Sequence, residues 1–367
     1  MEKIRTHISF TVTNDLSYDQ RMMRICNTLV DAGYEVELIG RKRKNSTPLE
    51  TKKYKQTWLN CWFSKGKMFY IEYNIRLFFY LLFSNTDVLS AIDLDTLLPN
   101  TIVSKIRSKN LAFDAHEYFT EVPEVYNRKL IRYIWSSIGN MCITHVDTAY
   151  TVGPALAEIF TQKYHKKFDV IRNVPLLEEI KQLVNKPQPP IIFYQGDINE
   201  GRGLEQIIRA MPSINAQLHI AGEGPLLSKL QQMAQSLNLT HKITFLGYVK
   251  PYNLPELLAQ ATVGLNILEN KGLSYHYSLS NKFFAYIHAE LPQVCAPFPE
   301  YLHINLTHEV AALCECSTTA LIDTINDLLY DSSRYSKLQQ NCRLAKQQYN
   351  WQAESQHLIQ LYQNVIS

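Results

Sequence analysis

Long apolar runs are absent from this 367-residue chain. The most apolar stretch, LFFYLLF at 77–83, is far shorter than the roughly 20 residues that a helix needs to span a bilayer. The first residues, MEKIRTHISFTVTND, contain no continuous apolar segment of the signal-peptide type. We therefore expect no transmembrane helix, and a cytoplasmic protein that is either free or peripheral at the inner face of the membrane.

Neither charge nor cysteine content points to a special class of protein. The net charge is only +3 and no motif that reads nucleic acid is present, so we expect no nucleic-acid partner. The seven cysteines form no C-x-x-C pair and no cluster with histidine, which argues against a zinc site. We expect reduced thiols and no metal.

Short strand-like runs alternate with helical patterns along almost the whole chain. The predicted strands lie at 8–12, 35–40, 87–93, 111–115, 148–153 and 168–173, then at 191–195, 217–222, 243–247, 262–267, 291–296 and 310–314. Between the first two, Met22, Ile25, Cys26 and Leu29 have the spacing of one buried helical face. This alternation predicts an α/β protein built on parallel sheets.

A proline cluster divides the pattern into two halves. The segment VPLLEEIKQLVNKPQPP at 174–190 is interpreted as a linker. We expect two Rossmann-like, doubly wound domains, 1–173 and 191–348, that face each other across a cleft. A C-terminal helix over 349–367 is expected to pack back on the first domain. In such folds ligands bind beyond the carboxyl ends of the strands.

Three turns at strand ends in the second half are polar or rich in glycine. GDINEGRG (196–203) places Arg202 between two glycines, GEGPL (222–226) follows the next strand, and Lys282 lies in the first turn of a later helix. If the strands are parallel, these turns lie along one edge of the sheet. Helix N-termini and two cations at that edge would bind a diphosphate.

These motifs resemble those of GT-B glycosyltransferases, most closely the family 4 branch, known as glycosyl transferases group 1. The second half carries YQGDINEGRGLEQIIRAMP, HIAGEGPL, ITFLGYV, LPELLAQATVGLNIL and SLSNKFFAYIHAELPQV. The first half carries NDLSYDQRMMRICNTLVDAGYEVELIG, AIDLDTLLP, FDAHEYFTEVPE and TVGPALAEIF. The resemblance covers nearly the whole chain, in the family's order.

The resemblance implies a particular reaction. The chain would be a hexosyl- or N-acetylhexosaminyltransferase that moves a sugar from a nucleotide-diphosphate donor to a glycan or lipid-linked acceptor. Configuration at the anomeric carbon would be retained, with the nucleotide sugar as substrate and neither metal nor cofactor required. The biological setting that the family suggests is the synthesis of a bacterial surface polysaccharide.

The resemblance also implies roles for individual residues. Arg202 and Lys282 would neutralise the leaving diphosphate, and His116 would lie near the donor sugar. Donor binding would involve Gly201, Gly203, Gly222, Glu223, Gly224, Tyr248, Val249, Ser280 and Asn281. The acceptor side would hold Asp19, Arg21 and Glu117, the first two in a loop after the first strand.

The chain departs from the family pattern near the expected ribose site. Ala285 occupies the position of the glutamate that usually binds the ribose hydroxyls, Tyr277 lies where a second glutamate is common, and Glu290 replaces a glycine. Alanine accepts no hydrogen bond, so about 1–3 kcal/mol of donor binding would be missing unless another residue such as Glu269 supplies it. Two alternatives therefore stay open: a GT-B-like partner or scaffold protein with little catalysis, and another GT-B enzyme such as a nucleotide-sugar 2-epimerase.

The segment 41–67 is strongly basic, with nine Lys or Arg residues against one acidic residue, and it contains Trp58 and Trp62. One interpretation is a solvated loop. The other is contact with an anionic membrane surface, where each Lys or Arg adds about 1 kcal/mol and Trp favours the interface.

Overall fold

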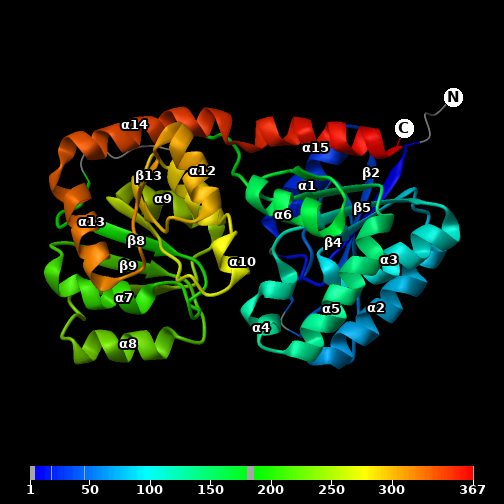
Figure 1. Cartoon of the computed structure of the whole chain (residues 1–367), viewed down its shortest axis with the longest axis horizontal. Coiled ribbons are helices and arrows are strands. Elements are labelled where there is room, and N and C mark those ends of the chain that lie inside the picture. The colour runs from blue at the N-terminus through cyan, green and yellow to red at the C-terminus, as the bar shows by residue number, and fades with distance from the viewer. Residues whose placement is uncertain (1–4, 18, 45, 180–185, 367) are drawn as a thin grey trace. The chain divides into compact units, whose positions relative to one another are not determined.

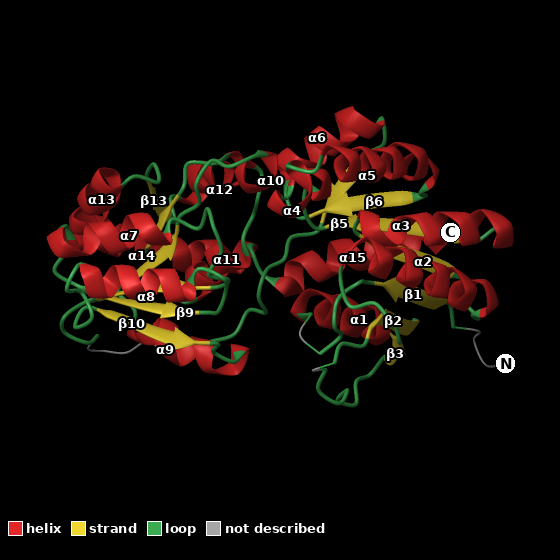
Figure 2. Ribbon diagram, turned by 90° about the horizontal axis from the view of Figure 1, so that it is seen from below, coloured by secondary structure: helices red, strands yellow, loops and turns green. Residues whose placement is uncertain are grey.

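The computed structural model describes residues 5–17, 19–44, 46–179 and 186–366. It divides into two compact units, one of residues 1–173 with 353–367 and one of residues 174–352. The chain therefore passes between the units twice, after Asn173 and after Gln352. Each unit has its own parallel sheet with helices packed on it (Figures 1 and 2). The predicted α/β class is confirmed.

The described residues of the first unit form a seven-stranded parallel sheet in the order β3-β2-β1-β4-β5-β6-β7. Its strands are β1 (His7–Thr11), β2 (Glu35–Arg41), β3 (Lys55–Leu59), β4 (Val88–Ile92), β5 (Asn110–Ala115), β6 (Thr148–Thr151) and β7 (Phe168–Val170). Its helices are α1 (Gln20–Asp31), α2 (Gly66–Phe83), α3 (Leu94–Arg107), α4 (Pro123–Tyr126), α5 (Lys129–Cys142) and α6 (Pro154–Tyr164). The central strands β4 and β5 are buried along almost their whole length, as expected for a parallel sheet that is covered on both faces.

The described residues of the second unit form a six-stranded parallel sheet in the order β10-β9-β8-β11-β12-β13. Its strands are β8 (Ile191–Gln195), β9 (Gln217–Ala221), β10 (Ile243–Gly247), β11 (Val263–Asn266), β12 (Gln293–Cys295) and β13 (Ala311–Leu313). Its helices are α7 (Leu204–Ala210), α8 (Leu227–Ser236), α9 (Leu254–Gln260), α10 (Leu273–His276), α11 (Asn281–His288), α12 (Pro299–His308), α13 (Thr318–Tyr330) and α14 (Ser332–Gln348). The strand order reverses between β8 and β11, which is where doubly wound sheets bind ligands.

The C-terminal helix α15 (Trp351–Ile366) packs on the sheet of the first unit. The hydroxyl of Tyr362 lies 2.7 Å from the Ser90 hydroxyl and 3.2 Å from the Tyr150 hydroxyl. The ring of Tyr362 lies 5.7 Å from the ring of Phe10, centre to centre. The last helix therefore completes the core of the unit in which the chain began.

The twelve predicted strands are all present, each within three residues of its predicted bounds. The thirteenth, β3, lies inside the basic segment 41–67, which we interpreted only as a loop or a membrane contact. Only Leu59 of its residues is fully buried, because β3 pairs with β2 at the edge of the sheet, where Lys55 is exposed. Within the described residues, none of the helices combines the length and the apolar character that crossing a bilayer requires.

Candidate functional site

The turn after β8 holds Arg202 between two glycines that the packing requires. Gly201 and Gly203 have φ angles of +80° and +68°, which favour glycine. A Cβ atom on Gly201 would lie 2.6 Å from the Tyr275 ring, and one on Gly203 would lie 2.7 Å from Ile267. The Arg202 guanidinium carbon lies 5.1 Å from the centre of the same Tyr275 ring. Its Nε is buried and has no hydrogen-bond partner among the described residues.

Lys282 is a second cation at this edge of the sheet. Its Nζ lies 4.2 Å from the centre of the Tyr194 ring, and it lies beside Gly196, where a Cβ atom would be only 3.5 Å from Nζ. Burial, reinforced by the charge of Arg202, lowers the pKa of Lys282 to about 7. Asp197 partly opposes this shift, but within the described chain it forms no ion pair with either cation. Two neighbouring cations with this surrounding are suited to bind a polyanion such as a diphosphate.

The turn after β9, GEG at 222–224, contains two glycines that lie very close to the backbone of the turn after β8. A Cβ atom on Gly222 would lie 1.9 Å from the Gly196 carbonyl oxygen, and one on Gly224 would lie 2.4 Å from the Ile198 carbonyl oxygen. The Ile198 N–H donates to the Glu223 carbonyl at 2.8 Å, so the two turns are joined by backbone hydrogen bonds. The Glu223 side chain is exposed. Both glycines are thus needed for the close approach of the turns after β8 and β9.

We expect Gly222→Ala to lower the free energy of unfolding by about 3 kcal/mol, because the added Cβ overlaps the Gly196 carbonyl. Urea denaturation followed by circular dichroism measures this change. Gly33→Ala is the matched control: Gly33 has a φ of +97° but nothing within 4 Å of its Cβ position, so only the backbone cost of about 1 kcal/mol applies. Equal losses in the two variants would contradict the steric explanation.

Ser280 and Asn281 begin helix α11. Ser280 precedes the helix, but its side chain does not cap it. The Ser280 hydroxyl donates instead to Asn266 Oδ1 at 2.9 Å, and its backbone N–H donates to the Tyr301 hydroxyl at 3.1 Å. Asn266 at the end of β11 therefore engages the Ser280 hydroxyl in place of a cap. Asn281 is exposed at the start of the helix.

The surroundings of Ala285 are apolar. Together with Val249 it borders a buried cluster of Phe193, Ala221, Leu258, Ala261, Tyr286, Ala289 and Leu291. Tyr248, next to Val249, is 54% exposed. Glu269, the suggested substitute for the missing carboxylate, accepts a hydrogen bond from Gln206 and pairs with Lys271 at 2.7 Å. Its side chain is thus already engaged beside the Arg202 turn, where its N–H donates to the Gly201 carbonyl at 2.9 Å.

Glu290 has a backbone conformation that glycine usually adopts. Its φ is +50°, in the left-handed region. Its buried carboxylate lies 2.8 Å from Arg343 and 2.5 Å from Lys346, both on α14. Burial alone would raise the pKa of Glu290, but the hydrogen bonds from these two cations lower it below the usual value. Glu290 therefore links the end of α11 to α14 through two ion pairs.

In the first unit, His116 follows β5 and lies among buried carboxylates. Its Nε2 lies 2.9 Å from Asp114, its Nδ1 lies 3.7 Å from Asp93, and its backbone N–H donates to Asp93 at 2.8 Å. Burial alone would lower the pKa of His116, but the carboxylates of Asp114 and Asp93 raise it to about 9. The Asp114 carboxylate therefore favours the charged imidazole, whereas the Arg21 Nε, which lies 3.0 Å from the same Nε2, disfavours it.

Asp19 ends the loop after β1, as expected, but Arg21 lies in helix α1 and not in the loop. Asp19 is the N-cap of α1 and accepts a hydrogen bond from the Met22 N–H at 3.0 Å. Arg21 is buried in the first turn of α1, where it donates twice to Asp114 at 3.1 Å and once to the Ile171 carbonyl at 3.0 Å. The missed signal was Asp19 itself, three residues before the apolar face of a helix. Arg21 thus contacts both Asp114 and His116, whose Nε2 accepts a hydrogen bond from the Arg21 Nε at 3.0 Å.

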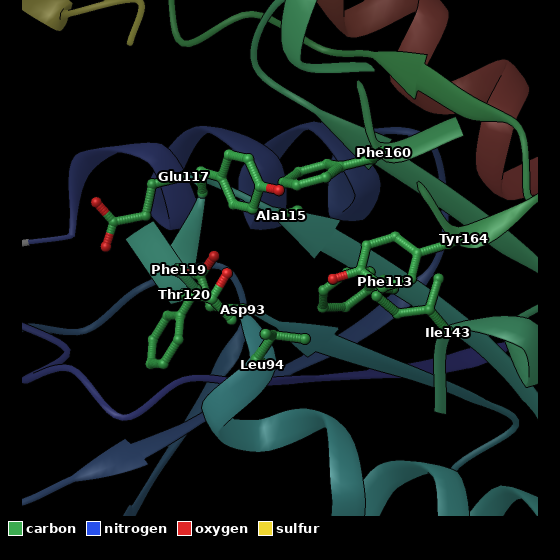
Figure 3. Close-up of a pocket in the computed structure, with 11 residues that line it drawn as sticks. Asp93, Leu94, Phe113, Ala115, Glu117, Phe119, Thr120, Ile143, Phe160 and Tyr164 are labelled. Atoms are coloured by element: carbon green, nitrogen blue, oxygen red, sulfur yellow. The ribbon is translucent and has the colours of Figure 1, made fainter. Parts of the chain in front are cut away.

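Two further carboxylates near His116 were not predicted from the sequence. Burial raises the pKa of Asp93 to about 8 and that of Asp95 to about 6. Asp93 has a φ of +57° and lines a small pocket of about 10 Å³, which is room for roughly one water molecule (Figure 3). In Figure 3 the exposed carboxylate of Glu117 points away from Phe160 and Tyr164, which line the same pocket. Both aspartates belong to AIDLDTLLP, where an acidic residue directly follows a buried strand.

The structure thus forms two groups of predicted residues. Arg202, Lys282 and the three polar turns meet at the carboxyl edge of the second sheet, while His116, Glu117 and the buried Arg21 belong to the first unit. Among the described residues, no three His, Cys, Asp or Glu side chains are grouped as a metal site would need.

Comparison with known proteins agrees with this arrangement. Residues 177–345 match the family described as glycosyl transferases group 1. A 77-residue segment, 20% of this chain and 20% of the relative, is 38% identical to a glycosyltransferase of Methanocaldococcus jannaschii.

Solved structures are similar over almost the whole chain. Sucrose-phosphate synthase from Thermosynechococcus elongatus superposes with a TM-score of 0.80 and 17% identity, covering 98% of this chain and 99% of that one. HepE from Anabaena, in complex with UDP-glucose, gives a TM-score of 0.77 and 13% identity over 98% and 100% of the two chains. At these identities the likeness shows the fold. Residues 177–345 are thus similar to glycosyl transferases group 1, and the chain has the GT-B fold.

Proposed function

We propose that this chain transfers a sugar from a nucleotide-diphosphate donor to an acceptor hydroxyl, and that Arg202 and Lys282 bind the donor's diphosphate. The observation that carries the proposal is the pair of neighbouring cations at the carboxyl edge of the second sheet. Arg202 leaves its buried Nε without a partner among the described residues, and Lys282 is held against an aromatic ring. The match of residues 177–345 to glycosyl transferases group 1 supports the same proposal.

In the proposed reaction, the bond between the anomeric carbon and the diphosphate oxygen breaks and a bond to the acceptor oxygen forms. Negative charge develops on the leaving diphosphate, and the two fixed cations stabilise it. The acceptor hydroxyl gives its proton to the leaving diphosphate oxygen as the new bond forms. We propose that the new bond lies on the face that the diphosphate leaves, which retains the configuration, and that side-chain cations take the place of a metal ion.

His116 is proposed to contact the donor sugar. With its Nε2 held by Asp114 and Arg21, the imidazole would form a hydrogen bond with a sugar hydroxyl or with the departing oxygen. We propose a hexose or N-acetylhexosamine as the sugar and a glycan or lipid-linked molecule as the acceptor. Exposed Glu117 and Asn281 are proposed to lie on the acceptor and donor sides respectively.

The apolar surroundings of Ala285 favour a second candidate, a GT-B-like partner protein with little catalysis. Where the family has a ribose-binding carboxylate, this chain presents an alanine beside Val249. The loss of one hydrogen-bonded carboxylate costs about 1–3 kcal/mol, or roughly 5- to 150-fold in donor affinity. Such a loss weakens a donor site without abolishing it, so we place the transferase first.

One assay distinguishes these candidates. The purified chain is incubated with UDP-, GDP-, ADP- and CMP-sugars, with and without glycan and lipid-linked acceptors, and products are resolved by NMR. Acceptor-dependent release of the nucleotide with a retained anomeric centre supports the proposal. An epimerised donor would instead indicate the nucleotide-sugar 2-epimerase, and no conversion of any donor would favour the partner protein.

A further inference from the structure

Helix α2 of the first unit exposes an apolar stripe from Ile71 to its C-terminal end at Phe83. Its inward side consists of Phe69, Tyr73, Leu77 and Leu81. On its outward side, Ile71, Ile75, Phe79 and Phe83 keep 52%, 53%, 54% and 82% of their surface exposed. At 1.5 Å per residue this stripe is about 18 Å long. Single exposed apolar residues are ordinary, but a continuous row of this kind indicates a surface that another body covers.

An open groove of about 820 Å³ runs beside the stripe, between α2 and the edge strand β3. Its apolar wall includes Ile75, Phe79 and Phe83, and its opposite wall includes Trp58 and Lys55. At the start of the helix, Trp62 is 87% exposed and lies against the guanidinium of Arg76 at 4.8 Å. The stripe is therefore flanked by aromatic and basic side chains, which is the composition of interfacial helices.

The same region carries a concentrated positive charge. Segment 41–67 holds nine Lys or Arg residues against one acidic residue, a net charge of +8, whereas the whole chain has +3. Segment 41–67 leads directly into α2 and includes β3, which forms one side of the groove. The apolar stripe and the basic segment thus form one continuous surface, which we name the α2 surface.

The positive charge of the α2 surface distinguishes between three possible partners: a second copy of the chain, a nucleic acid and an anionic lipid surface. A second copy of the chain would place the same patch of each copy in contact, and the two +8 segments would repel each other. The phosphate backbone of a nucleic acid would pair with the basic residues but would not bury the row of aliphatic and aromatic side chains. An anionic lipid surface satisfies both, because acyl chains accept the apolar stripe and head groups attract Lys and Arg.

We propose that the α2 surface docks on anionic lipid bilayers. Ile75, Phe79 and Phe83 enter the boundary between head groups and acyl chains, and segment 41–67 pairs with the anionic head groups. The docking is electrostatic and apolar together, so it needs both anionic lipid and an intact stripe. This inference is independent of the proposed function, since none of these residues belongs to the Arg202 or His116 groups.

Co-sedimentation of the full-length chain with vesicles tests the proposal. We expect binding to phosphatidylcholine vesicles that contain 30% phosphatidylglycerol, and little binding to pure phosphatidylcholine. The double variant Ile75→Glu with Phe79→Glu is expected to bind at least about tenfold more weakly. It loses apolar contact with the lipid, and its two added negative charges are repelled by the anionic head groups. Raising the salt concentration to 1 M is expected to weaken binding of the unchanged chain.

Leu306→Glu is the matched control. Leu306 is 86% exposed on α12 of the second unit, so this variant makes the same chemical change on another surface and is expected to bind normally. Equal binding by the double variant and the unchanged chain would overturn the proposal. So would the absence of vesicle binding together with a concentration-dependent dimer that the double variant abolishes, since a second copy would then cover the stripe. Circular dichroism verifies that both variants are folded.

Discussion

Arg202→Ala is expected to lower kcat/KM for the nucleotide-sugar donor by about 10²- to 10³-fold. Charge on the diphosphate is greatest after the glycosidic bond has begun to break, so a fixed cation at that position stabilises the transition state more than the ground state. The guanidinium is already oriented by the Tyr275 ring and needs little reorganisation. Steady-state rates of nucleotide release measure the change.

Arg209→Ala is the matched control for that variant. Arg209 is an exposed arginine in the last turn of the same short helix, α7, so its removal changes the net charge equally without touching the turn after β8. We expect activity within about twofold of the unchanged chain for this control. If Arg202→Ala retained full activity too, the role that we assign to Arg202 would be wrong.

Nucleoside diphosphate binding is expected to weaken as the pH rises from 7 to 9. The pKa of Lys282 is about 7 in the free protein, because burial and the nearby Arg202 disfavour its charged form. A bound diphosphate favours the charged form and raises that pKa. Above pH 7 the lysine must therefore take up a proton when the ligand binds, and affinity falls by up to about tenfold for each pH unit.

Titration calorimetry at pH 8 in buffers of different ionisation enthalpy measures this proton uptake, which we expect to approach one proton per ligand. In Lys282→Met the uptake and the pH dependence both disappear. Linkage also fixes the sign of a stability effect: between pH 7 and 10 the unfolded lysine is charged and the buried one is largely neutral, so stability rises with pH. Lys282→Met carries no titratable group at this position, so at pH 7 we expect it to unfold at a higher urea concentration than the unchanged chain. A binding reaction without proton uptake would show that Lys282 does not contact the ligand.

The sequence predicted the sheets well because strand and helix patterns alternate clearly in both units. Met22, Ile25, Cys26 and Leu29 are all buried on α1 as predicted. Strand β3 was missed because an edge strand can be polar on both faces, and KQTWL therefore resembles a charged loop. The apolar stripe on α2 was missed for the opposite reason: a helix that is apolar on all sides is usually interpreted as fully buried.

The candidate site was predictable where a residue type alone carries the chemistry, and less so where neighbours decide it. Arg202 and Lys282 were named from the turns that hold them. The lowered pKa of Lys282 depends on burial and on the nearby charge of Arg202, which only the fold brings about. Likewise Arg21 is separated from Asp114 by 93 positions, and no spacing rule identifies that ion pair.

The most direct test of the donor site compares a nucleoside diphosphate with the matching monophosphate. Calorimetry of the unchanged chain against UDP and UMP, GDP and GMP, and ADP and AMP, without added metal, is the measurement. The account predicts that one diphosphate binds in the micromolar range and at least about tenfold more tightly than its monophosphate, and that Arg202→Ala removes this difference. Equal binding of both forms, or no binding of any nucleotide, would contradict the assignment of Arg202 and Lys282 to a diphosphate.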